Sequence, residues 1–180
     1  VIALKSGATE SGREAAVAHT AAMAAEDRLI EGLFQQAGVV RIQDYTQLIL
    51  AGKALSMVRL PRGRRIGFLA PSGAMLVVLS DLCHRLGLEI PQLLPESIRR
   101  LQEISPPFIR MRNPVDIWAA ASTRGVEYGY REGLDVLLRD PHIDAVVVIL
   151  MLTEDTGIPG YDFIVELACQ YPEKPVMVAF

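Results

Sequence analysis

A single histidine, His19, stands in a stretch of small and polar residues that could present its imidazole to a reactant. An apolar run at residues 1–4 and the turn Lys5-Ser6-Gly7 precede it, and they predict a strand that leads into a loop and a short helix. Alanines at positions 21, 22, 24 and 25 follow it, so another surface could approach this backbone closely. Because a neutral imidazole nitrogen is nucleophilic near neutral pH, His19 is our candidate catalytic residue. A lone histidine among alanines is also typical of an ordinary helix surface.

A second candidate site is the turn Ser72-Gly73-Ala74, which follows the predicted strand 66–70 and begins the predicted helix 74–86. Ser72 can cap this helix, while the free N–H groups and the helix dipole attract an anion. The small residues Gly73 and Ala74 allow an anion to come close. The alternative is that the turn only joins a strand to a helix, as in any α/β protein.

The segment Asn113, Pro114, Val115 and Asp116 is the third candidate. The Asn113 amide could bond a carboxylate or phosphate oxygen, Pro114 stiffens the turn, and Asp116 could cap or orient a neighbour. The alternative is an Asx-Pro turn that binds no ligand.

Strands and helices alternate along the chain, which predicts an α/β protein with a mainly parallel sheet. A helix over 29–37 should end at Gly38, and Asp44 can cap the next one. The charged, Pro- and Gly-containing stretch 59–65 indicates a linker between domains. Beyond it we expect short strands at 66–70, 88–91 and 176–179, a fully buried strand at 145–152, and helices over 74–86, 95–104, 126–138 and 161–171.

Composition argues against several functions. The chain has 180 residues, is 51% hydrophobic and has a net charge of -3, which gives no basic face for nucleic acid. Cys83 and Cys169 resemble core thiols, and no spacing suggests a metal site. The longest apolar run is too short for a membrane span, so we expect a cytoplasmic protein. The start at Val1 and the end after the apolar run 176–179 suggest a piece of a longer protein.

The segments around these candidates resemble one enzyme family. They are Lys5 to Gly12, Ala18-His19-Thr20, Phe34 to Arg41, and Arg112 to Asp116. The pattern is similar to the NDP-forming acyl-CoA synthetases, relatives of succinyl-CoA synthetase, and the similarity covers most of the chain.

The resemblance implies flavodoxin-like, three-layer α/β/α units. Residues 1–58 would be the C-terminal part of one succinyl-CoA synthetase-like domain carrying the histidine loop, and 59–65 a linker. Residues 66–180 would be a second such domain, truncated at its C-terminus. An N-terminal CoA-binding domain would precede them, and an ATP-grasp domain would follow or lie on another chain.

The activity implied is an acid–CoA ligase that interconverts acyl-CoA, ADP and phosphate with acid, CoA and ATP. His19 falls on the position of the family's phosphohistidine, and the N–H groups at Ser72, Gly73 and Ala74 would hold its phosphoryl group. Residues 113–116 would lie close to the CoA thiol and the acyl phosphate. CoA, ATP or ADP, and Mg2+ are the implied cofactors, in an oligomer with an ATP-grasp domain or subunit.

Two alternatives stay open, because Ala21 stands where relatives have glycine after Ser-His-Thr. One is a non-catalytic module of a protein acetyltransferase that senses acyl-CoA or nucleotide. The other is a related transferase for carbamoyl or acyl groups. Retention of His19 favours the ligase.

Overall fold

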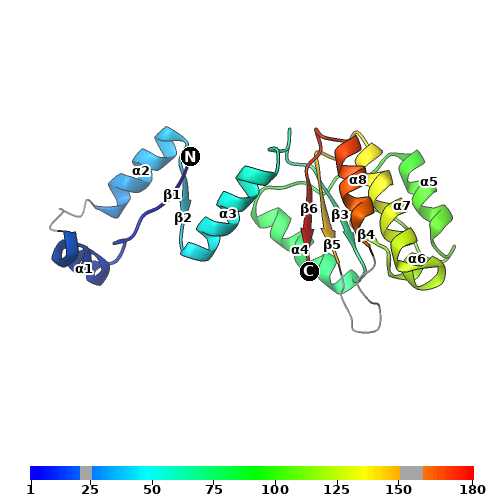
Figure 1. Ribbon diagram of the computed structural model, residues 1–180, viewed down its shortest axis with the longest axis horizontal. Coiled ribbons are helices and arrows are strands. Elements are labelled where there is room, and N and C mark those ends of the chain that lie inside the picture. Colours follow the sequence, from blue (N-terminus) through cyan, green and yellow to red (C-terminus); the bar gives the residue numbers. More distant parts are fainter. Residues whose placement is uncertain (21–25, 151–159) are drawn as a thin grey trace. The chain divides into compact units, whose positions relative to one another are not determined.

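The computed structural model describes residues 1–20, 26–150 and 160–180. The chain divides into two compact units, Val1–Val58 and Arg59–Phe180 (Figure 1). Both units combine helices with parallel strands.

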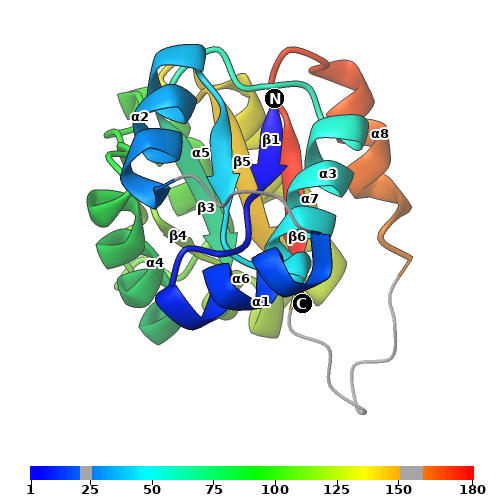
Figure 2. The same ribbon diagram turned by 90° about the vertical axis from the view of Figure 1, so that its left-hand side faces the viewer.

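The first unit joins a parallel strand pair to helices. In chain order its elements are β1 (Ile2–Leu4), α1 (Glu10–Thr20), α2 (Asp27–Ala37), β2 (Val40–Ile42) and α3 (Tyr45–Met57). Ile2 lies opposite Val40 where β1 and β2 run side by side (Figure 2). Gly38 ends α2 with a φ of 64°, and Asp44 Oδ1 accepts a hydrogen bond from the Gln47 N–H at 2.8 Å. The glycine stop and the aspartate cap are confirmed.

Arg41 connects β2 to the first turns of α2. Its guanidinium donates to both carboxylate oxygens of Asp27, at 2.5 and 2.8 Å, and to Glu31 Oε2 at 3.1 Å. The hydrogen bond from Arg41 lowers the pKa of Asp27. This charged bridge fixes α2 against the strand that follows it.

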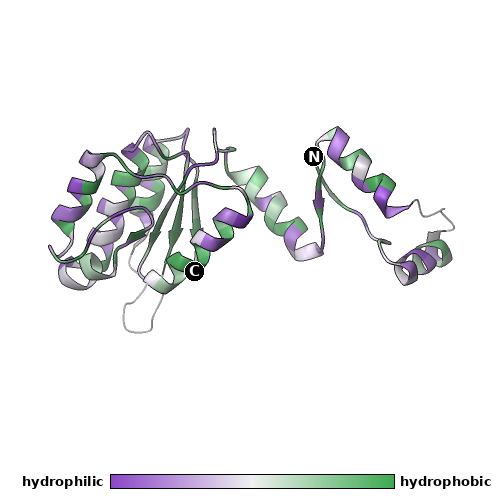
Figure 3. Ribbon diagram, turned by 180° about the vertical axis from the view of Figure 1, so that it is seen from behind, coloured by the Kyte–Doolittle hydropathy of each residue, from purple (hydrophilic) through white to green (hydrophobic). Residues whose placement is uncertain are grey.

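The second unit is built on a four-stranded parallel sheet in the order β4-β3-β5-β6. Its elements are β3 (Ile66–Ala70), α4 (Gly73–Arg85), α5 (Pro95–Ile104), β4 (Val115–Asp116), α6 (Trp118–Arg124), α7 (Val126–Arg139), β5 (Ala145–Ile149), α8 (Asp162–Gln170) and β6 (Val176–Ala179). Every residue of β3 is buried, as the continuous apolar run at this central strand requires. The central strands are correspondingly hydrophobic in Figure 3.

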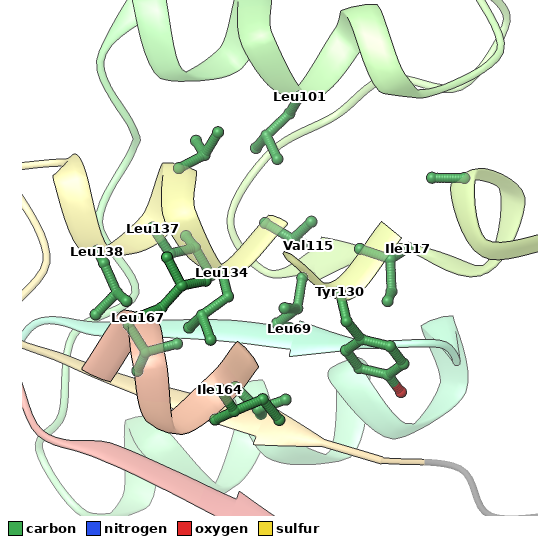
Figure 4. Packing of buried hydrophobic residues seen from close by; sticks show 14 of the residues in the cluster. Leu69, Leu101, Val115, Ile117, Tyr130, Leu134, Leu137, Leu138, Ile164 and Leu167 are labelled. Carbon is green, nitrogen blue, oxygen red and sulfur yellow. The ribbon is translucent and has the colours of Figure 1, made fainter. Parts of the chain in front are cut away.

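Two buried clusters lie on opposite faces of this sheet. The larger packs α5, α7 and α8 against the sheet through residues such as Leu69, Leu101, Leu134 and Leu167 (Figure 4). The smaller packs α4 against the other face through Leu76 and Cys83. Helices on both faces of this parallel sheet confirm the predicted three-layer α/β/α arrangement for the second unit.

Two predictions from the sequence are wrong, and a third is confirmed only over the described residues. Residues 88–91 form no strand, since Glu89 makes only an isolated bridge to Arg65. Cys83 is buried, which raises its thiol pKa, but Cys169 is exposed and is not a core thiol. The predicted strand 145–152 is confirmed as far as Ile149, and residues 151 and 152 lie outside the described residues.

The start of β3 is held to the start of β5 by Arg65 and Asp144. The Asp144 carboxylate accepts from the Arg65 backbone N–H at 3.0 Å, from Nε at 2.9 Å and from Nη2 at 2.7 Å. Asp144 is only 8% exposed, and the Arg65 hydrogen bond lowers its pKa from the ordinary value of 3.8. A Cβ on Gly63 would lie 2.2 Å from Asp144 Oδ2, so only glycine fits there.

Asp144→Asn should lower the free energy of unfolding by about 2 kcal/mol, because hydrogen bonds to a buried charge are lost. Denaturant unfolding at neutral pH measures this, with Asp81→Asn, an exposed aspartate on α4, as the control. Since the native pKa of Asp144 is lowered, its contribution is present above the ordinary carboxyl pKa and is lost as the pH falls through the native value. The difference between wild type and variant should therefore shrink below about pH 4. An unchanged difference at low pH would contradict this account.

Candidate functional site

His19 lies in the last turn of α1, and its side chain is exposed. At the other end of α1, Thr9 Oγ1 accepts a hydrogen bond from the Gly12 N–H at 3.2 Å, as a cap does. The Arg13 N–H also donates to the Thr9 carbonyl, at 2.9 Å. The polar residues before the histidine thus begin the helix that presents it. Residues 21–25, including the alanines after His19, lie outside the described residues.

Two glycines let the loop before α1 fold tightly. Gly7 has a φ of 77°, a conformation that favours glycine. A Cβ on Gly12 would lie 3.1 Å from Thr9 Oγ1 and 3.3 Å from the Gly7 Cα. The spacing of Gly7 and Gly12 therefore has a structural cause, which is the close packing of the loop on the first turn of α1.

The start of α4 leaves its first-turn N–H groups without a side-chain cap. Ser72 occupies the N-cap position with extended backbone angles, but its hydroxyl makes no capping hydrogen bond, contrary to our expectation. Unsatisfied N–H groups at a helix N-terminus carry a partial positive charge. A shallow cavity at this point is lined by Pro71, Ser72, Gly73, Asp116 and Trp118.

Asp116 stands beside this helix start. A Cβ on Gly73 would come within 3.2 Å of Asp116 Oδ2, so the glycine makes room for the carboxylate. The other carboxylate oxygen, Oδ1, accepts from the Trp118 N–H at 3.0 Å at the start of α6. Asp116 therefore holds the backbone at the start of α6, and its charge lies next to the N-terminus of α4.

Asn113 uses its amide within the protein. Its Nδ2 donates to the Ile66 carbonyl at 2.9 Å and to the Pro91 carbonyl at 3.2 Å, and its Oδ1 accepts from the Phe68 N–H at 3.1 Å. Both amide hydrogens are used in these bonds, so neither is left for a ligand. The Asn113 side chain therefore holds residues 113–116 against β3 and does not bind an anion. The peptide bond between Asn113 and Pro114 is cis.

The predicted site residues fall into two groups. His19 belongs to the first unit, and the other seven belong to the second. Within the second unit, Gly73 and Asp116 lie together, with Ser72 lining the same cavity. Val115 is fully buried on β4 beside Leu69 and faces the core instead. Ala74 is exposed on the first turn of α4 and does not line that cavity.

A larger depression, which the sequence did not predict, lies beside the N-terminus of α4. A cavity of about 370 Å³ lies between α4 and residues 109–116. A second cavity of about 620 Å³ adjoins it and shares Ser80, Arg112 and Pro114. The only signal for it in the sequence was the cation pair Arg110 and Arg112 just before Asn113. No cluster of three metal-ligating side chains occurs in the described parts of the chain.

Comparison with known proteins gives the family. Residues 1–55 match the model of the succinyl-CoA ligase like flavodoxin domain. The alpha subunit of Pyrococcus furiosus acetate–CoA ligase (ADP-forming) II is 33% identical over 157 residues, which are 87% of this chain and 33% of that protein. The ADP-forming acetate–CoA ligase II of Archaeoglobus fulgidus is 29% identical over 147 residues, 82% of this chain and 22% of that protein.

A solved structure agrees along nearly the whole chain. It is the dinucleotide-forming acetyl-coenzyme A synthetase 1 of Candidatus Korarchaeum cryptofilum in complex with phosphate and ADP, with a TM-score of 0.79 and 26% identity. The match covers 98% of this chain and 38% of that one. Residues 1–55 therefore belong to the succinyl-CoA ligase like flavodoxin domain family, and over most of its length the chain is similar to ADP-forming acyl-CoA synthetases. It spans about a fifth to a third of the length of these curated relatives.

The family assignment agrees with the local structure of the segments that suggested it. The stretch from Lys5 to Gly12 forms the capped loop before α1, and Phe34 to Arg41 forms the end of α2, its glycine stop and β2. The segments on which the resemblance rests therefore include several residues that shape the backbone. The roles of His19, Ser72 and Asp116 in chemistry are a separate question.

Asn113→Ala should lower the free energy of unfolding by about 2 to 3 kcal/mol, because three backbone groups lose their partner. Thermal or denaturant unfolding measures the change, and Gln92→Ala, a residue beside the same segment, is the control. A free energy of unfolding equal to that of the wild type would show that the Asn113 amide does not stabilise the fold. The amide would then again be a candidate for ligand binding.

Proposed function

We propose that the chain is part of an acid–CoA ligase of the NDP-forming type, which interconverts acyl-CoA, ADP and phosphate with acid, CoA and ATP. The single observation that supports this most is the similarity to ADP-forming acetate–CoA ligases over more than four fifths of the chain. The exposed position of His19, inside the segment that matches the succinyl-CoA ligase like domain, is consistent with the reaction.

His19 is the proposed phosphoryl carrier. In the direction of ATP synthesis, phosphate displaces CoA from the acyl-CoA and forms an acyl phosphate. An unprotonated ring nitrogen of His19 then attacks the phosphorus, the P–N bond forms, and the carboxylate leaves with the electrons of the broken P–O bond. ADP finally takes the phosphoryl group and the imidazole is restored. An exposed imidazole at a helix end suits this role, because each partner must reach it in turn.

The N-terminus of α4 is the proposed site for the phosphate or the acyl phosphate. Its N–H groups have no side-chain cap, and Gly73 allows close approach. Oriented N–H donors stabilise the charge that develops in phosphoryl transfer. The Asp116 carboxylate limits this attraction, since its Oδ2 lies beside Gly73. We therefore expect weak binding of free phosphate there, and stronger binding only of a ligand with further contacts.

CoA, ATP or ADP, and Mg2+ are the proposed cofactors, and the solved relative contains phosphate and ADP. One relative is named as an alpha subunit, which supports a multi-subunit enzyme, and we propose an ATP-grasp domain or subunit as the partner. In the described residues no helix is both long and apolar enough to cross a membrane. We propose a cytoplasmic location, where these cofactors are supplied.

His19→Ala should abolish acid-dependent formation of acyl-CoA from ATP and CoA by the full-length protein, because the phosphoryl group has no carrier. The measurement is the rate of thioester formation with acetate and related acids. His84→Ala is the control, since His84 is also an exposed helical histidine. Equal loss in both variants, or full activity of His19→Ala, would contradict the proposal. A wild-type protein that binds CoA esters but forms none would favour the sensing module.

A further inference from the structure

A small cavity lies between the start of α5 and the end of α7, and we call it the Ser97 cavity. Its volume is about 180 Å³, and Ser97 and Arg100 of α5 line it together with Arg139 of α7. Leu94, just before α5, donates its N–H to Asp140 Oδ2, just after α7, at 2.8 Å, so the two helix ends are fixed to each other. Sites for drug-sized ligands usually measure about 300 to 1,000 Å³. The Ser97 cavity therefore suits a small ion or the head of a larger molecule.

This cavity lies at the edge of the sheet where the strands begin. The end of α7 leads into β5 through Asp144, which bonds to Arg65 at the start of β3. The start of α4 and Asp116 belong to the other edge, because they follow the ends of β3 and β4. Among the described residues, none lines both the Ser97 cavity and the cavities beside α4. The Ser97 cavity is thus separate from the proposed site of phosphoryl transfer.

The Ser97 hydroxyl faces this cavity. Ser97 is only 8% exposed, and among the described residues its side chain has no hydrogen-bond partner. Ser105, at the other end of α5, is also 8% exposed, and within the described chain its Oγ is the one fully buried side-chain atom that lacks a partner. Ser97 Oγ therefore keeps some accessible surface, which lies in the cavity. A hydroxyl this deeply buried normally has a partner.

Two backbone N–H groups add to this hydroxyl. Pro95 begins α5 and has no N–H, and no side chain caps the helix. The N–H groups of Glu96 and Ser97 donate to no acceptor in the described ranges, as is usual in the first turn of a helix. Together with the Ser97 hydroxyl they make three donors at one helix end, where the helix dipole favours an anion.

Two arginines supply donors from the α7 side and from the second turn of α5. Both bond to the Asp135 carboxylate, Arg100 through Nη2 at 3.0 Å and Arg139 through Nε at 2.8 and 3.0 Å. Arg100 Nη2 also lies 3.6 Å from Glu132. In the part of the chain that the structure describes, Arg100 Nη1 and both Nη atoms of Arg139 donate to no acceptor. Each arginine therefore has donors left for a ligand.

Acceptors are scarce in the same cavity. Glu96 is the one acidic residue in its lining, and the Glu96 side chain is 77% exposed and lies 4.0 Å from Arg99 on the outer side of α5. The cavity thus combines a buried hydroxyl, two free N–H groups and two guanidinium groups around a space for a small ion. Charge-assisted hydrogen bonds from such donors are those that oxyanions accept.

We propose that the Ser97 cavity binds a tetrahedral oxyanion, the group shared by sulfate, inorganic phosphate and phosphomonoesters. The first turn of α5 and the Ser97 hydroxyl hold one side of the anion, and Arg100 and Arg139 hold the other. Donors on two sides suit a tetrahedral ion better than a planar carboxylate. The bound ion connects the start of α5 to the end of α7 and so stabilises the second unit. This inference does not rest on the proposed function.

The test is titration of the full-length protein with sulfate at constant ionic strength, by calorimetry and by melting temperature. Sulfate has the required shape and charge but takes no part in phosphoryl transfer. Ser97→Ala should weaken sulfate binding about tenfold, because one hydrogen bond to a charged group is lost. Its melting temperature without sulfate should equal that of the wild type, since the hydroxyl has no protein partner to lose.

Ser105→Ala is the matched control. It removes an equally buried hydroxyl without a partner from the same helix, but Ser105 does not line the cavity. Sulfate stabilises proteins generally by its exclusion from their surface. Ser105→Ala should show this general effect and wild-type sulfate binding as well. Sulfate bound at the start of α4 would be unaffected by either serine variant.

Charge variants test the arginines and the carboxylate independently. Arg139→Gln should weaken sulfate binding roughly threefold to tenfold, because a charge-assisted hydrogen bond in a partly solvated cavity is lost. Glu96→Gln should tighten binding about twofold, since it removes the acidic residue of the lining. Arg99→Gln is the control for charge, because Arg99 lies on α5 outside the lining of the cavity.

Competition with sulfate distinguishes the sources of the anion. Tighter binding of glycerol 3-phosphate than of inorganic phosphate assigns the cavity to a phosphorylated small molecule, and the reverse assigns it to the free ion. Wild-type sulfate affinity in both Ser97→Ala and Arg139→Gln, or an equal loss in Ser105→Ala, would overturn the proposal. Acyl-CoA formation by Ser97→Ala without sulfate is measured in parallel. Its retention would show that the fate of the proposed function is independent of this cavity.

Discussion

The side chain of Asn113 is the constraint on which the second unit's candidate site depends. β4 pairs with β3 only at Leu69 and Ala70, and upstream of these residues the Asn113 amide bonds to Ile66 and Phe68 in place of a neighbouring strand. It thereby fixes residues 113–116 along β3. Asp116 is placed beside Gly73 as a consequence, and Arg112 and Pro114 line the cavity between α4 and residues 109–116.

Helix α4 contributes to the site in two ways. Its N-terminus has N–H groups without a side-chain cap, and its flank supplies Leu76, Val77 and Ser80 to the cavity beside residues 109–116. Gly73 makes room for the Asp116 carboxylate, since an added Cβ would lie 3.2 Å from Asp116 Oδ2. The uncapped N–H groups of α4, the Asp116 carboxylate and the exposed side chains of Arg110 and Arg112 therefore lie along adjoining cavities.

Much of the fold could be predicted because the local signals were strong. The continuous apolar runs of β3 and β5 are those of central parallel strands, and Gly38 and Asp44 mark helix ends by backbone geometry and capping. The short elements could not be predicted. β4 has only two residues, too few to show a hydrophobic periodicity. The start of α6 depends on a hydrogen bond from the Trp118 N–H to Asp116, which the sequence does not reveal.

For the candidate site, the sequence could not predict which groups each side chain contacts. The sequence identified Asn113 as a polar group but could not show that its amide was already bonded to backbone. Ser72 occupies the predicted cap position without making the capping bond. Cys169 has apolar neighbours in sequence, yet it lies on the outer side of α8. The significance of Arg110 and Arg112 arises only when α4 packs beside them, which no spacing in the sequence reveals.

The most direct test of the central claim is to locate the phosphoryl group on the protein. Full-length protein is incubated with ATP and magnesium, digested at alkaline pH, where phosphohistidine survives, and the peptides are sequenced by tandem mass spectrometry. The account predicts a phosphate on the ring of His19 that disappears when ADP is added. An active ligase whose peptide containing His19 is never phosphorylated, or whose phosphate lies on another residue, would contradict it.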